Sequence, residues 1–505
     1  MSATRGSRIS ATVVPIIVAL AFVAELSLTG CSDAVHGHPS AAAPGAVVDP
    51  GAVAPGATAG PRADVDTTPP SRPTESPSES RGAAPVDAAI VTGGTGTPSD
   101  QLAANVVTGV EQFWRERFPA EFGRRWINIH AFHAVDPGEP DVPAPCLRRP
   151  LDLTDQALYC PRRDIVAWDR DGLVPRLRNT YGDGAVLVAL AHEIGHAVQD
   201  RLGISAEVQL REPTRYPTIL LEGMADCFAG VAVHAAADGK VAKVTLSRAD
   251  LDRALQALLT FRDPVGVAIG STAHGDAFDR VSAFLDGYQS GAGTCAAMTV
   301  HNQTFTQRGY NSLSDVMQGG DLPLADLLSS MSPDAYGWFG KLAASRGRPW
   351  RTPLVSVLAQ GRCPTPDVDH QGPVRYCPSS GAVSVSASEL RLVQDGFGDY
   401  ASAELVASRY ALATLAALGR PVQGPEAGRT AVCLTGAYTR SLFDRSGGGG
   451  FGLSPGDIDE AVQELLAQDL AARDASGRPP SGDLGFERIG QFRTGALGGP
   501  SSCGV

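Results

Sequence analysis

An internal repeat is the feature that most limits how this chain of 505 residues can fold. Residues 181–203 align without gaps on residues 397–419, with identical residues at seven of the 23 positions. Four further segments match in the same order: GRRW with GRPW, ALYCP with VRYCP, LSRADLDRALQALL with LSPGDIDEAVQELL, and AFDRVSAFLDGYQSGAGTC with GFERIGQFRTGALGGPSSC. The sequence therefore predicts a duplicated unit, with one copy over residues 99–323 and the other over residues 324–505.

Helical patterning dominates the predicted units. Apolar residues recur at helical spacing over 103–118, 184–202, 218–237, 248–261 and 277–289. The β-prone pieces WINIHAF (126–132) and DIVAW (164–168) indicate a small sheet near the start of each unit. We therefore expect a mainly α fold of the α+β class, built twice.

The N-terminal segment has the features of an export signal. Arg5 and Arg8 precede an apolar run, and Leu-Thr-Gly-Cys follows it and ends at Cys31. This pattern over residues 1–30 is typical of a bacterial lipoprotein signal peptide, so we expect an exported chain, lipidated at Cys31 and held on the outer face of the cell membrane. Plain secretion and a retained anchor are the alternatives. Residues 31–98, rich in Ala, Pro, Ser and Thr, are expected to form a disordered tether.

The charge and the cysteines also restrict what the chain does. A formal net charge of −12 without a basic run excludes a nucleic-acid partner. Besides Cys31, four cysteines occur in the same order in each copy, an even number that suits disulfides in an oxidising compartment. If both copies pair alike, the local solution is Cys146 with Cys160, Cys227 with Cys295, Cys363 with Cys377 and Cys433 with Cys503. Bridges between the copies, or buried free thiols, are the alternatives.

The stretch His192-Glu193-Ile194-Gly195-His196 carries the chemistry of the first copy. Residues four apart share one face of a helix, so His192 and His196 can present two imidazoles to one metal ion, with Glu193 beside a metal-bound water. Zinc in catalytic sites usually takes a third protein ligand. The apolar segment LLEGMADCFAG supplies Glu222, and one turn later Asp226, which can accept the free N–H of a ligand histidine.

The ordered motifs YCP, AHEIGHAVQ, LEGMADCFAG, LSRADLDRAL and AHGDAFDRVSAFLDGYQSG resemble the putative neutral zinc metallopeptidases of bacteria. The resemblance covers about residues 155–297 and implies a zincin-like domain with Zn²⁺. It implies His192, His196 and Glu222 as zinc ligands, Glu193 as general base and Asp226 as their support. Ala197 and Ala273 stand where the family often has His and Thr. In zinc peptidases of this type a further donor binds the oxyanion, and His274 is the candidate here; a loop histidine bonded to backbone is the alternative.

The second copy lacks this chemistry. On the alignment, His192, Glu193 and His196 correspond to Ser408, Arg409 and Leu412. Glu222, Asp226 and His274 correspond to Gly428, Val432 and Gly482. We expect the second copy to fold, to bind no zinc in this way, and to pack against the first within the chain.

The sequence thus predicts a membrane-anchored zinc peptidase that cleaves peptide or protein substrates in the cell envelope or outside the cell. The alternative is a non-catalytic envelope binding or scaffold lipoprotein in which the metal is structural or absent. The zinc content of the purified protein is the first observation that separates the two.

Overall fold

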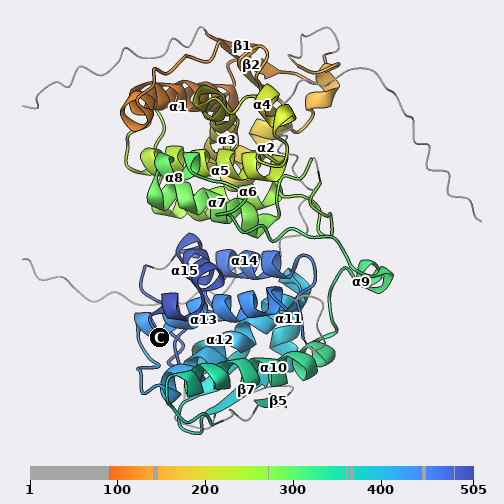
Figure 1. Ribbon diagram of the computed structural model, residues 1–505, viewed down its shortest axis with the longest axis vertical. Helices are drawn as coiled ribbons and strands as arrows, with labels where there is room; N and C mark the ends of the chain where they lie inside the picture. Colours follow the sequence, from red (N-terminus) through yellow and green to blue (C-terminus); the bar gives the residue numbers. More distant parts are fainter. Residues whose placement is uncertain are drawn as a thin grey trace, which may run out of the picture. The chain divides into compact units, whose positions relative to one another are not determined.

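The protein is described by a computed structural model, which covers residues 90–139, 146–270, 272–351, 353, 355–358, 362–363, 369–445, 451–482 and 484–505 (Figure 1). The expected signal peptide, Cys31 and most of the expected tether lie outside the described residues. The tether was expected to reach residue 98, but Val91–Thr92 forms strand β1 and Pro98 begins helix α1. The described fold therefore begins earlier than the composition indicated.

The segment that precedes residue 324 is mainly helical, as expected. Its helices are α1 (Pro98–Phe122), α2 (Leu173–Tyr181), α3 (Asp183–Leu202), α4 (Ala206–Arg211), α5 (Thr218–Ala237), α6 (Arg248–Thr260), α7 (Ala277–Ser290), α8 (Ala292–Ala296) and α9 (Leu313–Gln318). The central α3 packs against α1, α5 and α6, and α7 lies side by side with α5 (Figure 1). Five of these helices cover the five expected helical ranges, which confirms the mainly α class.

Helix α5 combines the features of a membrane span with those of a core helix. Its length and its mean hydropathy of 1.4 would allow it to cross a membrane, but 89% of that window is buried inside the protein. Its apolar residues pack against α3 and α7 on two sides. Glu222 and Asp226 lie within this buried helix, so both carboxylates need partners there.

A small sheet stands beside these helices, in the order β1-β2-β4-β3. Strand β2 (Ala131–Val135) runs parallel to β4 (Ile165–Asp169), and β3 (Ala157–Cys160) runs antiparallel to β4. The expected strand over 126–132 is wrong in its bounds, since only residues 131 and 132 enter the sheet. The preceding residues bind α1 instead, where Trp126 Nε1 and the Ile129 amide both donate to the buried Glu111 Oε1, at 2.9 and 3.0 Å.

The segment from residue 324 repeats this order of elements. It contains α10 (Leu324–Ser345), β5 (Val355–Leu358), β6 (Val374–Cys377), β7 (Ala382–Ser386), α11 (Ala387–Phe397), α12 (Asp399–Ala417), α13 (Pro425–Phe443), α14 (Asp457–Ala467) and α15 (Gly485–Gly498). The sheet order β5-β7-β6, with one parallel and one antiparallel pair, matches β2-β4-β3. A duplication would produce this agreement in topology.

Cysteines and glycines support the same correspondence. Disulfides join Cys146 to Cys160, Cys227 to Cys295, Cys363 to Cys377 and Cys433 to Cys503, which are the pairs expected for copies that pair alike. A Cβ atom at Gly287 would lie 1.7 Å from the Cys227 carbonyl oxygen, and one at Gly495 would lie 1.7 Å from that of Cys433. The closest approach of α7 to α5 thus recurs between α15 and α13.

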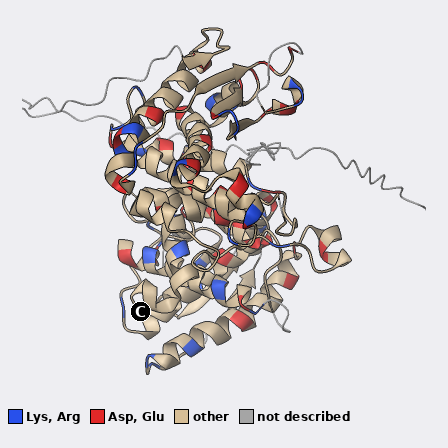
Figure 2. Ribbon diagram, turned by 45° about the horizontal axis from the view of Figure 1, so that its top comes forward, with Lys and Arg blue, Asp and Glu red and all other residues tan. Residues whose placement is uncertain are grey.

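Contacts between the two segments are reciprocal. Asp252 of α6 accepts the amide N–H of Phe486 at the start of α15, at 3.0 Å. Asp459 of α14 accepts the amide N–H of Phe278 at the start of α7, at 3.2 Å. These residues occupy aligned positions, and such mutual exchange is typical of a two-fold interface. Basic and acidic residues are interspersed over the described elements (Figure 2).

Candidate metal centre

Helix α3 holds the HEIGH stretch in the middle of the core. The helix starts after Gly182 and ends at Gly203, whose φ values of 85° and 91° let the chain turn sharply at both ends. His192 and His196 lie one turn apart on the face toward α5, and each is only 2% exposed. The ring centroids are 4.8 Å apart. Both imidazoles are therefore presented together, as the spacing predicted.

Helix α5 brings Glu222 against these two rings. His192 Nε2 lies 3.2 Å from Glu222 Oε2, and His196 Nε2 lies 3.7 Å from Oε1. One ligand atom from each of the three residues falls within 4.8 Å of the others. All four atoms are buried without a hydrogen-bond partner in the described part of the chain. Two imidazole nitrogens and a carboxylate, left unsatisfied around one point, fit a divalent cation such as Zn²⁺.

The other ring nitrogens are held by neighbouring side chains. Asp226 Oδ1, fully buried, accepts the Nδ1–H of His192 at 2.7 Å. Gln199 Oε1 does the same for His196, at 3.1 Å, while its Nε2 donates to the Leu221 carbonyl. These bonds place a proton on Nδ1 of each ring and leave each Nε2 lone pair free for a metal.

Arg280 of α7 completes this arrangement. Its Nε and Nη2 donate to Asp226 Oδ2 and Oδ1, at 2.9 and 2.8 Å, and its Nη1 donates to the Phe261 carbonyl at 2.6 Å. The guanidinium is 1% exposed. Asp226 therefore stays ionised in the core and orients His192.

Without a cation, the charges of the site shift several pKa values. Burial alone would lower the pKa of His192, but Asp226 and Glu222 outweigh it and raise this pKa to about 10. Burial lowers the pKa of His196 to about 4. Burial would raise the pKa of Glu222, but His196 and His192 lower it to about 2. The carboxylates of Glu222 and Asp226 thus favour a positive charge at the site, and a divalent cation would supply it.

Glu193 is a buried carboxylate next to the two histidines in the sequence. Neither of its oxygens has a partner among the described residues, and the side chain is 0% exposed. Burial raises its pKa to about 8, and the charge of Glu222 adds to the rise. An unpartnered carboxylate beside the ligand set is suited to exchange a proton with a bound molecule.

His274 lies near the centre but outside the ligand group. Asp263 Oδ1 accepts from the Nδ1 of His274 at 2.9 Å, and its Nε2 is buried without a partner in the part of the chain that the structure describes. Burial opposes protonation, but Asp263 and Glu222 raise the pKa of His274. Together with Arg280 it lines a pocket that also includes Leu220 and Phe305. His274 is thus a hydrogen-bond donor aimed into a small pocket.

Sequence reasoning missed the supports of the site. Gln199 follows His196 by three residues on the same helix, so helical spacing could have suggested it. Arg280 aligns with Arg488, and an arginine kept at both aligned positions was a usable signal. Asp263 lies in a loop with no pattern that points to His274.

In the second segment, other parts of the chain fill the region that corresponds to the candidate metal site. Arg409, at the position of Glu193, is 0% exposed and donates to the carbonyls of Gln371, Val374, Leu470 and Arg473. A Cβ atom at Gly428, at the position of Glu222, would lie 2.0 Å from the Ala472 carbonyl oxygen. The backbone near residue 472 therefore occupies the space where Glu222 extends in the first segment.

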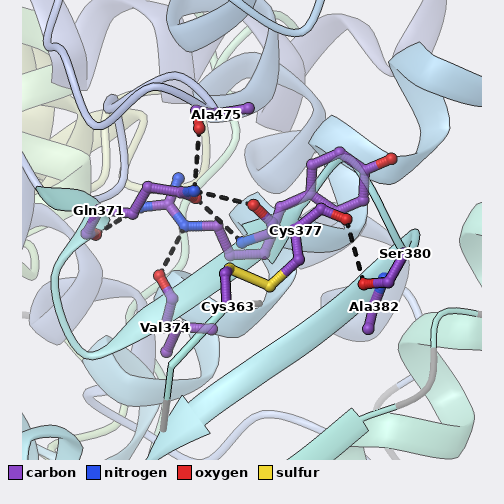
Figure 3. Close-up of a disulfide and its surroundings, with 9 residues drawn as sticks. Cys363, Gln371, Val374, Cys377, Ser380, Ala382 and Ala475 are labelled. Atoms are coloured by element: carbon purple, nitrogen blue, oxygen red, sulfur yellow. Dashed lines mark hydrogen bonds between the residues drawn. A yellow bond between two sulfur atoms is a disulfide. The ribbon is translucent and has the colours of Figure 1, made fainter. Parts of the chain in front are cut away.

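Gln371, beside Arg409, links strand β6 to the backbone near residue 475 through hydrogen bonds. Gln371 Nε2 donates to the Ala475 carbonyl at 3.1 Å and to the Tyr376 carbonyl at 2.8 Å. Figure 3 shows Gln371 between Ala475 and Val374, close to the Cys363–Cys377 disulfide. These bonds make the second segment a packed scaffold at the place where the first holds its ligands.

A buried acidic pair in the second segment gives a pH-dependent prediction. Glu404 and Glu464 are 0% exposed, and none of their carboxylate oxygens has a partner in the described structure. Burial raises the pKa of Glu464 to about 8, against arginine charges that lower it. A pKa raised by folding adds stability below the unfolded value near 4.5, and that stability is lost as pH rises through 8.

The substitution Glu464→Gln should therefore raise the free energy of unfolding above pH 8 by on the order of 5 kcal/mol, with little effect near pH 4. Urea denaturation of the whole chain at both pH values measures it. Glu426→Gln, on an exposed helix position, is the control and should show no such difference. An equal change at both pH values would contradict the buried charge.

The region that holds the candidate ligands is similar to a known family. Residues 154–298 match the model of a family described as putative neutral zinc metallopeptidase. The uncharacterized proteins YpfJ of Escherichia coli K12 and of E. coli O6:H1 CFT073 are each 34% identical to this chain over 149 residues, which is 26% of this chain and 50% of theirs. The chain thus spans about half the length of these curated relatives. No solved structure matches it. Residues 154–298, which contain every candidate ligand, are thus similar to the family of putative neutral zinc metallopeptidases.

Proposed function

We propose that the protein is a zinc-dependent peptidase whose catalytic centre is the cluster on α3 and α5. The observation that carries the proposal is the set of unsatisfied buried ligand atoms of His192, His196 and Glu222, next to an unpartnered Glu193. Zinc held there would polarise the carbonyl of the scissile peptide bond and acidify a water molecule.

The side chains around the ligands have separate roles in this reaction. Glu193 accepts the proton of the attacking water on a carboxylate oxygen and delivers it to the leaving amine. Asp226 and Gln199 fix the ring tautomers of His192 and His196 through Nδ1. His274 Nε2, held by the bond from Nδ1 to Asp263, donates to the oxyanion of the tetrahedral intermediate.

The segment from residue 324 is proposed to be a degenerate copy that supports the first. Its matching topology and the reciprocal contacts of Asp252 and Asp459 favour a pseudo-dimer within one chain. The export signal in the sequence favours action outside the membrane, with the lipid on Cys31 as anchor. Envelope or extracellular peptides and proteins are the proposed substrates.

A second function is favoured by one observation. All three ligands are at most 2% exposed, and closed coordination is typical of structural metal sites. In that case the protein would be a binding or scaffold lipoprotein that zinc stabilises. The two functions differ in whether zinc-loaded protein turns over peptides.

Zinc analysis combined with peptide hydrolysis tests the proposal. The purified wild-type chain should contain one zinc per chain and cleave peptides in a reaction that a chelator abolishes and added zinc restores. His196→Ala should lose the zinc and the cleavage, because only two protein ligands would remain, one fewer than a catalytic zinc site usually has. His301→Ala, at an exposed loop position, is the matched control and should keep both. Zinc without hydrolysis would favour the structural function, and hydrolysis that survives His196→Ala would refute the assigned centre.

A further inference from the structure

Four carboxylates meet where the end of the first segment reaches the second, far from the HEIGH stretch in sequence. Asp321 follows α9, Asp399 begins α12, and Asp457 and Glu460 lie in the first turn of α14. We call these four residues the junction cluster. One carboxylate oxygen from each of Asp321, Asp399 and Glu460 lies within 4.8 Å of the others. Three chain segments thus converge on one acidic point.

Two members of the junction cluster, Asp399 and Asp457, are buried. Asp399 is 3% exposed; its Oδ2 accepts the Leu322 amide N–H at 2.7 Å, while its Oδ1 has no partner among the described residues. Glu460 Oε2 accepts the Tyr400 amide N–H at 2.8 Å. Over the described ranges no Lys, Arg or His forms an ion pair with any of the four carboxylates. A buried carboxylate oxygen with acidic neighbours and no donor is costly unless a cation meets it.

At the aligned positions of the first segment, an arginine neutralises part of the carboxylate charge. Asp183 and Asp250 correspond to Asp399 and Asp457, and Arg253 stands where the second segment has Glu460. Arg253 forms an ion pair with Asp250 and lies against Gly182 at the start of α3. The same scaffold therefore carries an internal cation in one segment and an additional carboxylate in the other.

Glu460, which stands at the position of Arg253, lies close to the start of α12. A Cβ atom at Gly398 would lie 2.0 Å from the Glu460 carboxyl carbon, so the absence of a side chain there lets this carboxylate reach the start of α12. Burial and the neighbouring carboxylates raise the pKa of Glu460 to about 10 and that of Asp399 to about 6. The charge of Arg308 lowers the pKa of Asp457, which burial raises. A bound cation would favour ionisation of the other three carboxylates.

We propose that Asp321, Asp399 and Glu460 bind a calcium ion, which fastens the segment before α10 to the first turns of α12 and α14. Calcium takes carboxylate oxygens at about 2.3–2.6 Å, so two oxygens on one ion lie at most about 5 Å apart. The three carboxylate oxygens lie within 4.8 Å of one another, which is inside this limit. The exposed side of Asp321 leaves room for the waters that complete calcium coordination.

Calorimetric titration of the zinc-loaded full chain with CaCl₂ tests the site. Wild type should bind one ion with a dissociation constant on the order of 0.1–1 mM, the range of extracellular calcium modules, and its melting temperature should rise with calcium. Glu460→Arg installs the residue of the first segment and should weaken calcium binding by about 100-fold or abolish it. Glu426→Arg makes the same charge change at an exposed position of α13 and should bind calcium as wild type does.

Two further arms separate this site from the zinc centre and from other cations. His196→Ala should still bind calcium, since the junction cluster shares no residue with the zinc ligands. MgCl₂ should bind more weakly than CaCl₂, because magnesium demands near-ideal octahedral geometry. The proposal is overturned by the absence of calcium binding in wild type up to about 10 mM, by wild-type affinity in Glu460→Arg, or by tighter binding of magnesium.

Discussion

Replacement of Glu193 by glutamine should reduce peptide hydrolysis about 100-fold to 10,000-fold while zinc remains bound. Glutamine keeps the size of the side chain but accepts no proton, so the attacking water loses its base. Glu193 is not one of the three ligands whose atoms converge, so the metal should stay. Steady-state kinetics with a fluorogenic peptide, together with zinc analysis of the same preparation, measures both quantities.

The control for this variant is Glu116→Gln, an exposed position on α1. Its rate and zinc content should match wild type. Unchanged hydrolysis in Glu193→Gln would remove Glu193 from the mechanism. Loss of zinc along with activity would also contradict its role, because it would make this carboxylate part of the coordination instead.

The candidate ligands were predictable because helix geometry is local. A spacing of four residues places two imidazoles on one face of any helix, whatever packs around it. Glu222 and Asp226 could be found for a similar reason, since two carboxylates one turn apart in an apolar segment need a partner. The structure brings both carboxylates to these imidazoles, as the pattern indicated.

The supporting residues depend on tertiary contacts that no local pattern encodes. Arg280 reaches Asp226 from 54 positions away, across the packing of α7 on α5. Asp263 orients His274 from within a loop. The strand bounds failed for the same reason: β propensity at residues 126–130 is overridden because Glu111 of α1 takes the Trp126 and Ile129 donors.

The absence of the candidate site residues from the second segment was visible in the sequence, but the contacts that take their place were not. The alignment places Arg409 where Glu193 stands in the first segment. Only the structure reveals that this arginine binds four backbone carbonyls, and that the backbone at Ala472 covers Gly428. In the second segment, other parts of the chain thus fill the space that the candidate site residues occupy in the first.

Removal of the Asp226 carboxylate should have the largest effect on stability. The substitution Asp226→Ala leaves the Arg280 guanidinium buried without its counter-charge, which typically costs about 3–5 kcal/mol. It also frees the His192 ring, so zinc affinity should fall about 10-fold to 100-fold. Urea denaturation of metal-free protein measures the first effect, and competition with a zinc chelator measures the second.

The double variant Asp226→Ala/Arg280→Met separates the charge from the packing. If the cost comes from the unpaired guanidinium, the second substitution should recover most of the lost stability, while zinc affinity stays low. The second segment shows how such an arginine can be accommodated without the aspartate. Val432 stands at the position of Asp226, and Arg488, at the position of Arg280, donates to the carbonyls of Leu465 and Leu466. A cost below about 1 kcal/mol in Asp226→Ala would mean that Arg280 turns to backbone carbonyls as Arg488 does. Asp226 would then serve the histidine alone.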